Sequence, residues 1–110
     1  MRIPNWDRAV IHPDKLQDYL LNLEHERGGS KAALLLSFGY EPENWQLLED
    51  DLRKYHLAAE VTATRETTYG QRYEIQAALL APDGRSVTVR SIWQIDKGTD
   101  YPRLITLFPD

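Results

Sequence analysis

The chain has 110 residues and a mass of 12.8 kDa, the size of one domain, with no room for a second, cofactor-binding domain. It contains no cysteine, which excludes disulfides, thiolate metal sites and a cysteine nucleophile. Thirteen basic and 17 acidic residues give a net charge of −4, whereas a nonspecific nucleic-acid binder carries a basic surface. We therefore expect a single domain over residues 1–110.

The negative charge is concentrated in one segment. Residues 41–60 hold six acidic and two basic residues, and the other 90 residues hold eleven of each sign. No stretch is long and apolar enough to cross a membrane, and the N-terminus lacks the apolar core of a signal peptide. These features predict a cytoplasmic protein that has an acidic region and leaves room for a local basic site.

The first half of the chain has helical periodicity in three segments, 13–23, 30–38 and 42–55. Pro13 and Pro42 suit first helical turns, and Ser30 is a suitable N-cap for the second helix. That second helix is apolar on most sides, so we expect it to be the buried one. The apolar stripes facing the core are predicted to be Leu16, Tyr19, Leu20 and Leu23 in the first helix, and Trp45, Leu48, Leu52 and Tyr55 in the third.

The second half changes to the period of two that is typical of strands, in segments 58–67, 71–81, 85–96 and 103–108. The Pro82-Asp83-Gly84 sequence predicts a hairpin turn between two paired strands. In the third strand, Val87, Val89, Ser91, Trp93 and Ile95 share one face, and Thr88, Arg90, Ile92 and Gln94 share the other. The pattern predicts an α+β fold, with about three N-terminal helices packed on one face of a C-terminal antiparallel sheet of about four strands.

Sequence motifs for nucleotides and metals are missing. There is no Walker loop, GxGxxG or HExxH, and His12, His25 and His56 lie in separate segments without ligand spacing. The run Glu49-Asp50-Asp51 could be a metal cluster or a solvated acidic face. Neighbouring positions on a helix point apart, which favours the solvated face. We predict no metal and no cofactor.

Two polar features could carry chemistry. Residues 25–31 place a histidine, two cations and two glycines before a helix N-terminus, where an anion could bind, with Arg27 and Lys31 adding charge. The simpler alternative is an inter-helix turn capped by Ser30. The second feature is Arg90 and Thr106, which are polar in strands that otherwise look buried. They could bind a substrate or be ordinary solvent-facing residues.

The same residues carry a family resemblance. The strings are IPNWDRAVIHPDKLQDYLLN, HERGGSKA, SFGYEPENWQLL, LLAPDGRSVTVRSIWQI and PRLITLFP, which together extend from Ile3 to Pro109. This pattern resembles a bacterial domain family of unknown function, found as small stand-alone proteins, commonly encoded beside another small protein, and as C-terminal modules of polymorphic toxins. Its layout is similar to the metal-independent ribonuclease superfamily of barnase, EndoU, the tRNase colicins and RelE-type toxins.

The resemblance implies a set of site residues. Such enzymes activate a ribose 2′-hydroxyl and stabilise a phosphorane with side chains from helices and sheet, without a metal. The implied catalytic residues are Lys15, His25, Lys31, Arg90 and Thr106, and the implied substrate-binding residues are Arg27, Ser30, Trp93 and Arg103. The chain departs from the family at several positions. Leu23 and Glu26 replace prolines, Ser91 replaces threonine, and Leu107-Phe108 replaces Ala-Tyr, which removes a hydroxyl group.

Two functions from different classes follow. The first is a toxin of a toxin–antitoxin or polymorphic-toxin system, a metal-independent ribonuclease with RNA as substrate and a small cognate protein as partner. The second is a non-enzymatic partner-binding protein of the antitoxin or immunity kind, or a small interaction module. The acidic segment 41–60 and the lost tyrosine hydroxyl at Phe108 favour this second function, since an acidic face suits a basic partner. An uncharacterised domain with an unknown ligand is a third possibility.

Overall fold

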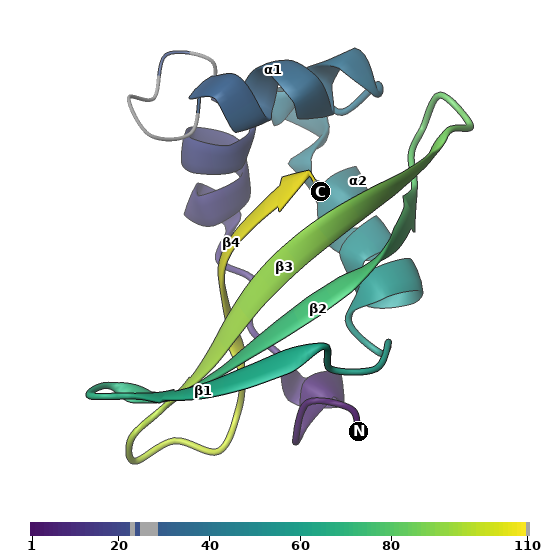
Figure 1. Ribbon diagram of the computed structural model, residues 1–110. Coiled ribbons are helices and arrows are strands. Elements are labelled where there is room, and N and C mark those ends of the chain that lie inside the picture. The colour runs from purple at the N-terminus through teal and green to yellow at the C-terminus, as the bar shows by residue number, and fades with distance from the viewer. Residues whose placement is uncertain (23, 25–28, 110) are drawn as a thin grey trace.

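The computed structural model describes residues 1–22, 24 and 29–109, and for residues 29–31 and 109 it describes only the backbone. Four strands form one antiparallel sheet in the order β1-β2-β3-β4, in which each strand pairs with the next along the chain (Figure 1). The strands are β1 (Ala63–Thr67), β2 (Gly70–Leu80), β3 (Ser86–Asp96) and β4 (Arg103–Pro109). The predicted hairpin turn over 82–84 joins β2 and β3, which pair over their whole length.

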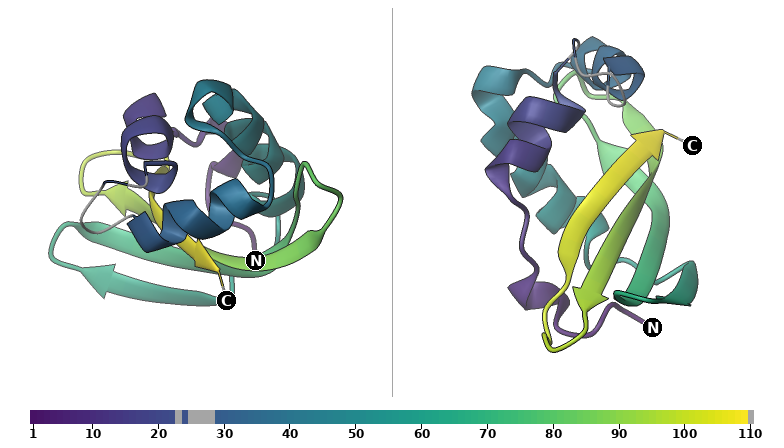
Figure 2. Two further views of the ribbon diagram at one scale, coloured as in Figure 1. Left: turned by 90° about the horizontal axis from the view of Figure 1, so that it is seen from above. Right: turned by 90° about the vertical axis from the view of Figure 1, so that its left-hand side faces the viewer.

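The helices gather on one side of this sheet (Figure 2). They are η1 (Trp6–Arg8), η2 (Lys15–Leu20), α1 (Gly29–Ser37), η3 (Pro42–Asn44), α2 (Trp45–Asp51) and η4 (Leu52–His56). In Figure 1, α1 crosses one end of the sheet, while η2 and α2 lie behind it. The α+β class with N-terminal helices and an antiparallel sheet is confirmed. Within the described part of the chain, none of these helices has the length and apolar character needed to span a membrane.

Two local predictions were wrong. The first strand begins at Ala63 and not at residue 58, because η4 ends in turns in which the Ala59 amide donates to the His56 carbonyl. The second helix begins at Gly29, and the side chain of Ser30, the predicted N-cap, lies outside the described part of the chain. That helix is also not the most buried one, since Ala33 and Ser37 are exposed. It covers an end of the sheet, where only one side of a helix meets the core.

The third predicted helix is built from three kinds of turn. A 3-10 turn, η3, leads into α2, and the last turn, η4, is a π-helix in which the Leu57 amide donates to the Leu52 carbonyl. A π-turn contains one residue more than an α-turn, so the apolar stripe moves on by one position. Tyr55, expected to face the core, is therefore 37% exposed, and His56 is buried in its place.

The core lies between the helices and the sheet. Leu48 and Leu52 pack in one cluster with Ile75 and Trp93, as predicted, and Trp45 is half-buried against it. The N-terminal segment also contributes, through buried Ile3, Ala9 and Ile11. Val10 forms a short parallel bridge with Arg103. This bridge ties the start of the chain to the edge of β4.

A chain of hydrogen bonds crosses the core from Trp93 to His56. The indole Nε1–H of Trp93 donates to Ser91 Oγ at 2.7 Å, and Ser91 Oγ lies 3.0 Å from His56 Nδ1. His56 Nε2 lies 3.1 Å from the Val89 carbonyl oxygen, which can only accept, so this nitrogen carries the proton. Ser91 therefore donates to Nδ1, and every polar side chain in the network is satisfied by a neutral histidine.

This network predicts that the protein loses stability on acidification at pH values above those at which carboxylates take up protons. Burial lowers the pKa of His56 below its usual 6.5, so the unfolded state binds more protons than the folded state. Stability is then complete above pH 6.5 and falls as the pH drops from 6.5 toward 5, by at most about 1.4 kcal/mol per pH unit. Urea unfolding between pH 7.5 and 5 measures this slope.

The control is His56→Gln, whose amide can still donate to the Val89 carbonyl. Its stability should be lower at pH 7.5 and nearly constant down to pH 5. An equal slope in both proteins would assign the acid sensitivity to other groups.

Candidate functional site

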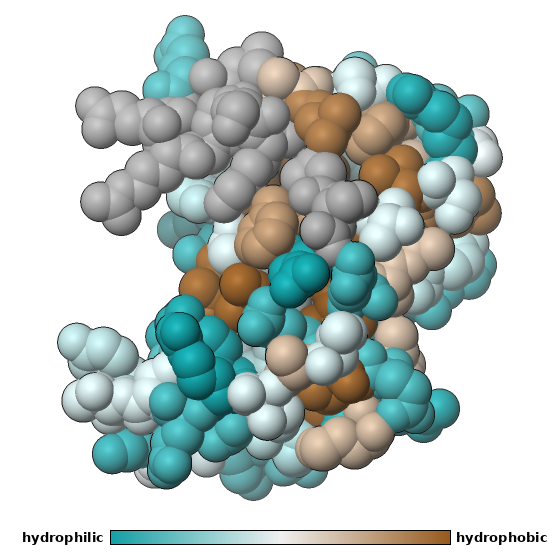
Figure 3. Space-filling view, viewed as in Figure 1, coloured by the Kyte–Doolittle hydropathy of each residue, from teal (hydrophilic) through white to brown (hydrophobic). Residues whose placement is uncertain are grey.

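The face of the sheet opposite the helices, here called the open face, faces the viewer in Figures 1 and 3. The alternation of side chains along each strand and the register of the strand pairs determine which residues belong to this face. They include four arginines, Arg65, Arg72, Arg90 and Arg103, and two carboxylates, Glu74 and Asp96. Hydrophilic residues gather over this part of the surface in Figure 3. The open face is thus locally basic in a chain whose net charge is −4.

One residue from each strand forms a row across the open face. Arg65 pairs with Arg72, Arg72 with Gln94, and Gln94 with Arg103. We call these four residues the arginine row. Side chains at paired positions of neighbouring strands point to the same face and come within contact distance of one another.

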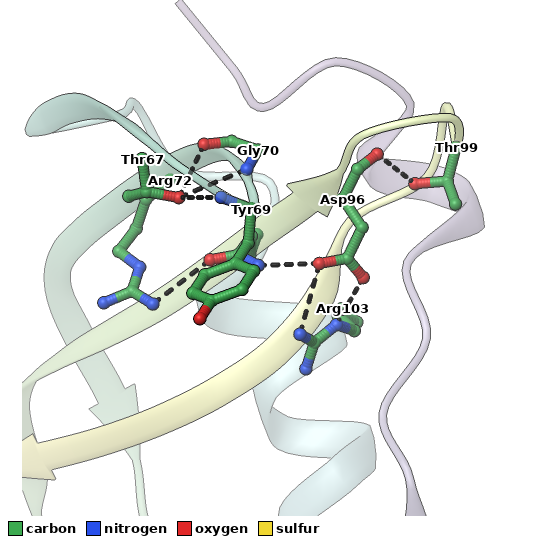
Figure 4. A network of polar contacts seen from close by, with 8 residues as sticks. Thr67, Tyr69, Gly70, Arg72, Asp96, Thr99 and Arg103 are labelled. Carbon is green, nitrogen blue, oxygen red and sulfur yellow. Dashed lines mark hydrogen bonds and ion pairs between the residues drawn. The ribbon is translucent and has the colours of Figure 1, made fainter.

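Hydrogen bonds and an ion pair connect the row to Asp96 (Figure 4). Arg72 Nη2 donates to Gln94 Oε1 at 3.1 Å, and Gln94 Nε2 donates to Asp96 Oδ1 at 2.6 Å. Arg103 binds the same carboxylate with two groups, Nε at 2.6 Å and Nη2 at 3.2 Å. The hydrogen bonds from Arg103 and then Gln94 hold the pKa of Asp96 below its usual range, so this carboxylate stays ionised.

Two cations of the row keep donors available. Among the described residues, no carboxylate lies within ion-pair distance of Arg65 or Arg72. The Arg65 side chain is exposed, and the half-buried Arg72 gives one donor to Gln94, while its buried Nε is out of reach of a bound molecule. A guanidinium has five N–H donors, so both groups can bind an anion without losing an existing ion pair.

An acid–base pair lies beside the row. Arg90 Nη1 donates to Glu74 Oε1 at 3.3 Å, and both side chains are about 30% exposed. Glu74 pairs with Ile92, and Ile92 pairs with Thr106, so Glu74 and Thr106 belong to one row across the sheet. A bulge between β3 and β4 at Ile92 and Trp93 keeps Thr106 and Arg103 on the same face.

The structure therefore brings three of the predicted site residues, Arg90, Arg103 and Thr106, onto the open face. Trp93 points to the opposite face, where it is completely buried and its N–H is bonded to Ser91. From that position it makes no contact with a molecule bound to the surface. His25 and Arg27 lie outside the described residues, and for Ser30 and Lys31 only the backbone in the first turn of α1 is described.

Lys15 lies in a different place, on η2 in the helical layer. It lines a surface groove of about 290 Å³ together with His12, Asp14, Asp18 and Tyr19. Its ammonium group is 5.3 Å from the centre of the Tyr19 ring. In the described part of the chain, no group of three or more His, Asp or Glu side chains is placed to hold a metal ion.

Sequence reasoning missed Arg72, Glu74 and Asp96. The signal for Arg72 and Glu74 was present, because residues 71–81 alternate, and the residues next to the buried Tyr73 and Ile75 must face outward. The hairpin turn then sets the register that places Glu74 diagonally beside Arg90. The ends of the row on β1 and β4 depend on pairings that no local signal reveals.

The fold and the open face define a small α+β domain with a basic sheet surface. The chain belongs to the family described as Domain of unknown function (DUF6883), whose pattern matches residues 2–110. No curated protein sequence matches the chain.

A solved structure shares the fold. It is a chain of the "Contact-dependent growth inhibition toxin - immunity protein complex from Klebsiella pneumoniae 342", with a TM-score of 0.66. The two chains are 14% identical, and the similarity covers 92% of this chain and 99% of that one. At this level of identity, the comparison establishes a common fold over the whole domain.

Proposed function

We propose that this protein is a toxin that acts with a cognate neutralising protein and that it cleaves RNA on its open face without a metal ion. The observation that carries the proposal is the juxtaposition of a carboxylate with arginines on the open face of an otherwise acidic chain. The shared fold with a chain of a toxin–immunity complex supports the biological setting. The resemblance to metal-independent ribonucleases supports the reaction.

RNA supplies its own nucleophile, the 2′-hydroxyl. The protein therefore has to provide only a base, an acid and cations for the cleavage. The 2′-hydroxyl attacks the adjacent phosphorus, the bond from phosphorus to the 5′-oxygen breaks, and a 2′,3′-cyclic phosphate forms. In this proposal Glu74 would accept the proton of the 2′-hydroxyl, and Arg90, which lies beside it, would neutralise the phosphorane. Thr106 would hold a phosphate oxygen. Lys31 and His25 are the candidates that return a proton to the 5′-oxygen, whereas Lys15 lies in the helical layer on the other side of the sheet and is not proposed for this step.

Induced expression in a bacterial host tests the proposal. Wild-type protein should slow growth, and purified protein should cleave total RNA in EDTA to products with 2′,3′-cyclic phosphate ends. Glu74→Gln should lower the cleavage rate by about 10²–10⁴-fold, and Arg90→Ala by at least about 10²-fold. Thermal unfolding verifies that both variants are folded.

Arg53→Ala is the matched control. It removes one arginine from the helical layer, where Arg53 pairs with Glu49 across one helical turn, and this partly exposed pair adds little stability. Toxicity and cleavage should therefore be unchanged. A wild-type protein that is harmless on over-expression and inert on total RNA at low salt would contradict the proposal.

A partner-binding function of the immunity kind is the second candidate. The acidic segment 41–60 forms η3, α2 and η4, so its charge lies in the helical layer, away from the open face. Such a surface complements a basic protein. A harmless protein whose co-expression protects cells from a toxin encoded beside it would favour this function over RNA cleavage.

A further inference from the structure

The turn between β1 and β2 displays an exposed aromatic ring on a rigid backbone. Tyr69 is 74% exposed, the highest value among the large exposed hydrophobic residues of the described chain. Thr67 Oγ1 accepts from the Tyr69 and Gly70 amides, both at 3.2 Å, and donates to the Gly70 carbonyl at 2.9 Å. The Tyr69 carbonyl accepts from the Lys97 amide at 2.9 Å, which ties this turn to the β3–β4 loop.

This ring lies at the same end of the sheet as the arginine row. Figure 4 shows the Tyr69 side chain on the side of the sheet that carries the guanidinium groups of Arg72 and Arg103. Arg65 and Arg72 are the two cations of the row without a described carboxylate partner. One end of the open face thus combines an exposed aromatic ring on a fixed turn with two cations that are available to an anion.

We infer that this end of the open face binds single-stranded RNA beside the cleaved bond, with a base stacked on Tyr69 and phosphates held by Arg65 and Arg72. Aromatic rings flanked by cations are how proteins hold unpaired nucleotides, because every base has a stacking face and every linkage a charge. A duplex hides its base faces, so Tyr69 has nothing to stack on. The inference rests on the proposed function and names its substrate class as unpaired RNA.

Because the turn is rigid, binding a base to Tyr69 costs little conformational entropy. The backbone of the turn is already fixed by the Thr67 hydroxyl, so stacking a base restricts only the side-chain torsions of Tyr69. Removing the ring leaves these backbone hydrogen bonds in place. The variant Tyr69→Ala is therefore expected to fold normally, and a binding defect would report on the ring itself.

The test measures binding apart from cleavage. The probe is a short fluorescent 2′-O-methyl oligoribonucleotide, which lacks the attacking hydroxyl, and its affinity is measured by anisotropy at low salt. Tyr69→Ala should weaken binding at least about fivefold, and Tyr69→Phe should bind like wild type. Tyr55→Ala, which removes an exposed tyrosine from the helical layer, is the matched control and should have no effect.

The contribution of the arginine charges to RNA binding is measured from the salt dependence of Kd. Arg65→Ala should reduce the slope of log Kd against log salt by about 0.7, the value for one phosphate of a single strand, and Arg53→Ala should leave it unchanged. Wild-type protein should bind the single strand more tightly than a duplex of the same sequence.

Three results would overturn the inference: equal RNA binding by wild type and Tyr69→Ala, no RNA binding by the wild-type protein, or a wild-type protein that binds an acidic peptide through Tyr69 and does not bind RNA. The last would assign this surface to a protein partner. Failure of the proposed function looks different. A protein that binds the oligonucleotide through Tyr69 but cleaves no RNA would refute the ribonuclease proposal and leave the binding site intact.

Discussion

Replacing Trp93 with alanine is expected to lower the free energy of unfolding by about 3–5 kcal/mol, a large part of the stability of a domain this size. The indole is fully buried in the cluster that joins the helices to the sheet. Its loss leaves a cavity and removes the donor to Ser91. Urea unfolding at pH 7.5 measures the loss.

Trp93→Phe separates packing from hydrogen bonding. The phenyl ring fills most of the space but donates no hydrogen bond, so Ser91 loses one partner, at a cost of about 1 kcal/mol plus a small packing term. If Trp93→Ala kept nearly wild-type stability and lost RNA binding instead, a substrate-binding role would replace the structural one that its burial indicates.

The parts of the fold that sequence could predict are those set by local rules. The period of two over residues 71–80 and 86–96, interrupted by Pro82-Asp83-Gly84, determines two strands, their turn and which side chains face inward. Arg90 and Thr106 were singled out as candidates for the same reason, since each is a polar residue in a strand that is otherwise apolar. Alternation is a property of each strand by itself, and it needs no knowledge of the neighbours.

What sequence could not predict depends on contacts between distant segments. The π-turn of η4 moves His56 into the core, where Ser91 and Val89, more than 30 positions away, satisfy it. The arginine row needs three pairings and a bulge to align Arg65, Arg72 and Arg103. Tyr69 lies between the predicted strand segments 58–67 and 71–81, and only the pairing of the strands shows that its ring is displayed beside the arginine row.

At this end of the sheet, the strand pairing is most sensitive to substitution at Gly70. Its φ of +151° is one that other residues rarely adopt, and a Cβ added there would lie 2.1 Å from the Ile95 carbonyl oxygen and 2.9 Å from Asp96 Cα. Both are backbone atoms of the paired strand β3, which cannot yield without opening the β2–β3 pairing. Gly70→Ala is expected to destabilise the protein by about 3 kcal/mol or more, combining strain and steric overlap.

The controls are Gly84→Ala and Gly98→Ala. Both glycines also have positive φ, of +89° and +85°, but an added Cβ would meet nothing within 4 Å. Each should cost only the backbone strain, about 1 kcal/mol. In urea unfolding, Gly70→Ala should therefore be clearly less stable than either control. Equal losses in the three variants would show that the close approach to Ile95 is relieved at little cost. Because Gly70 pairs with both Thr67 and Asp96, opening the strands there would also release Tyr69 and the arginine row from their fixed positions.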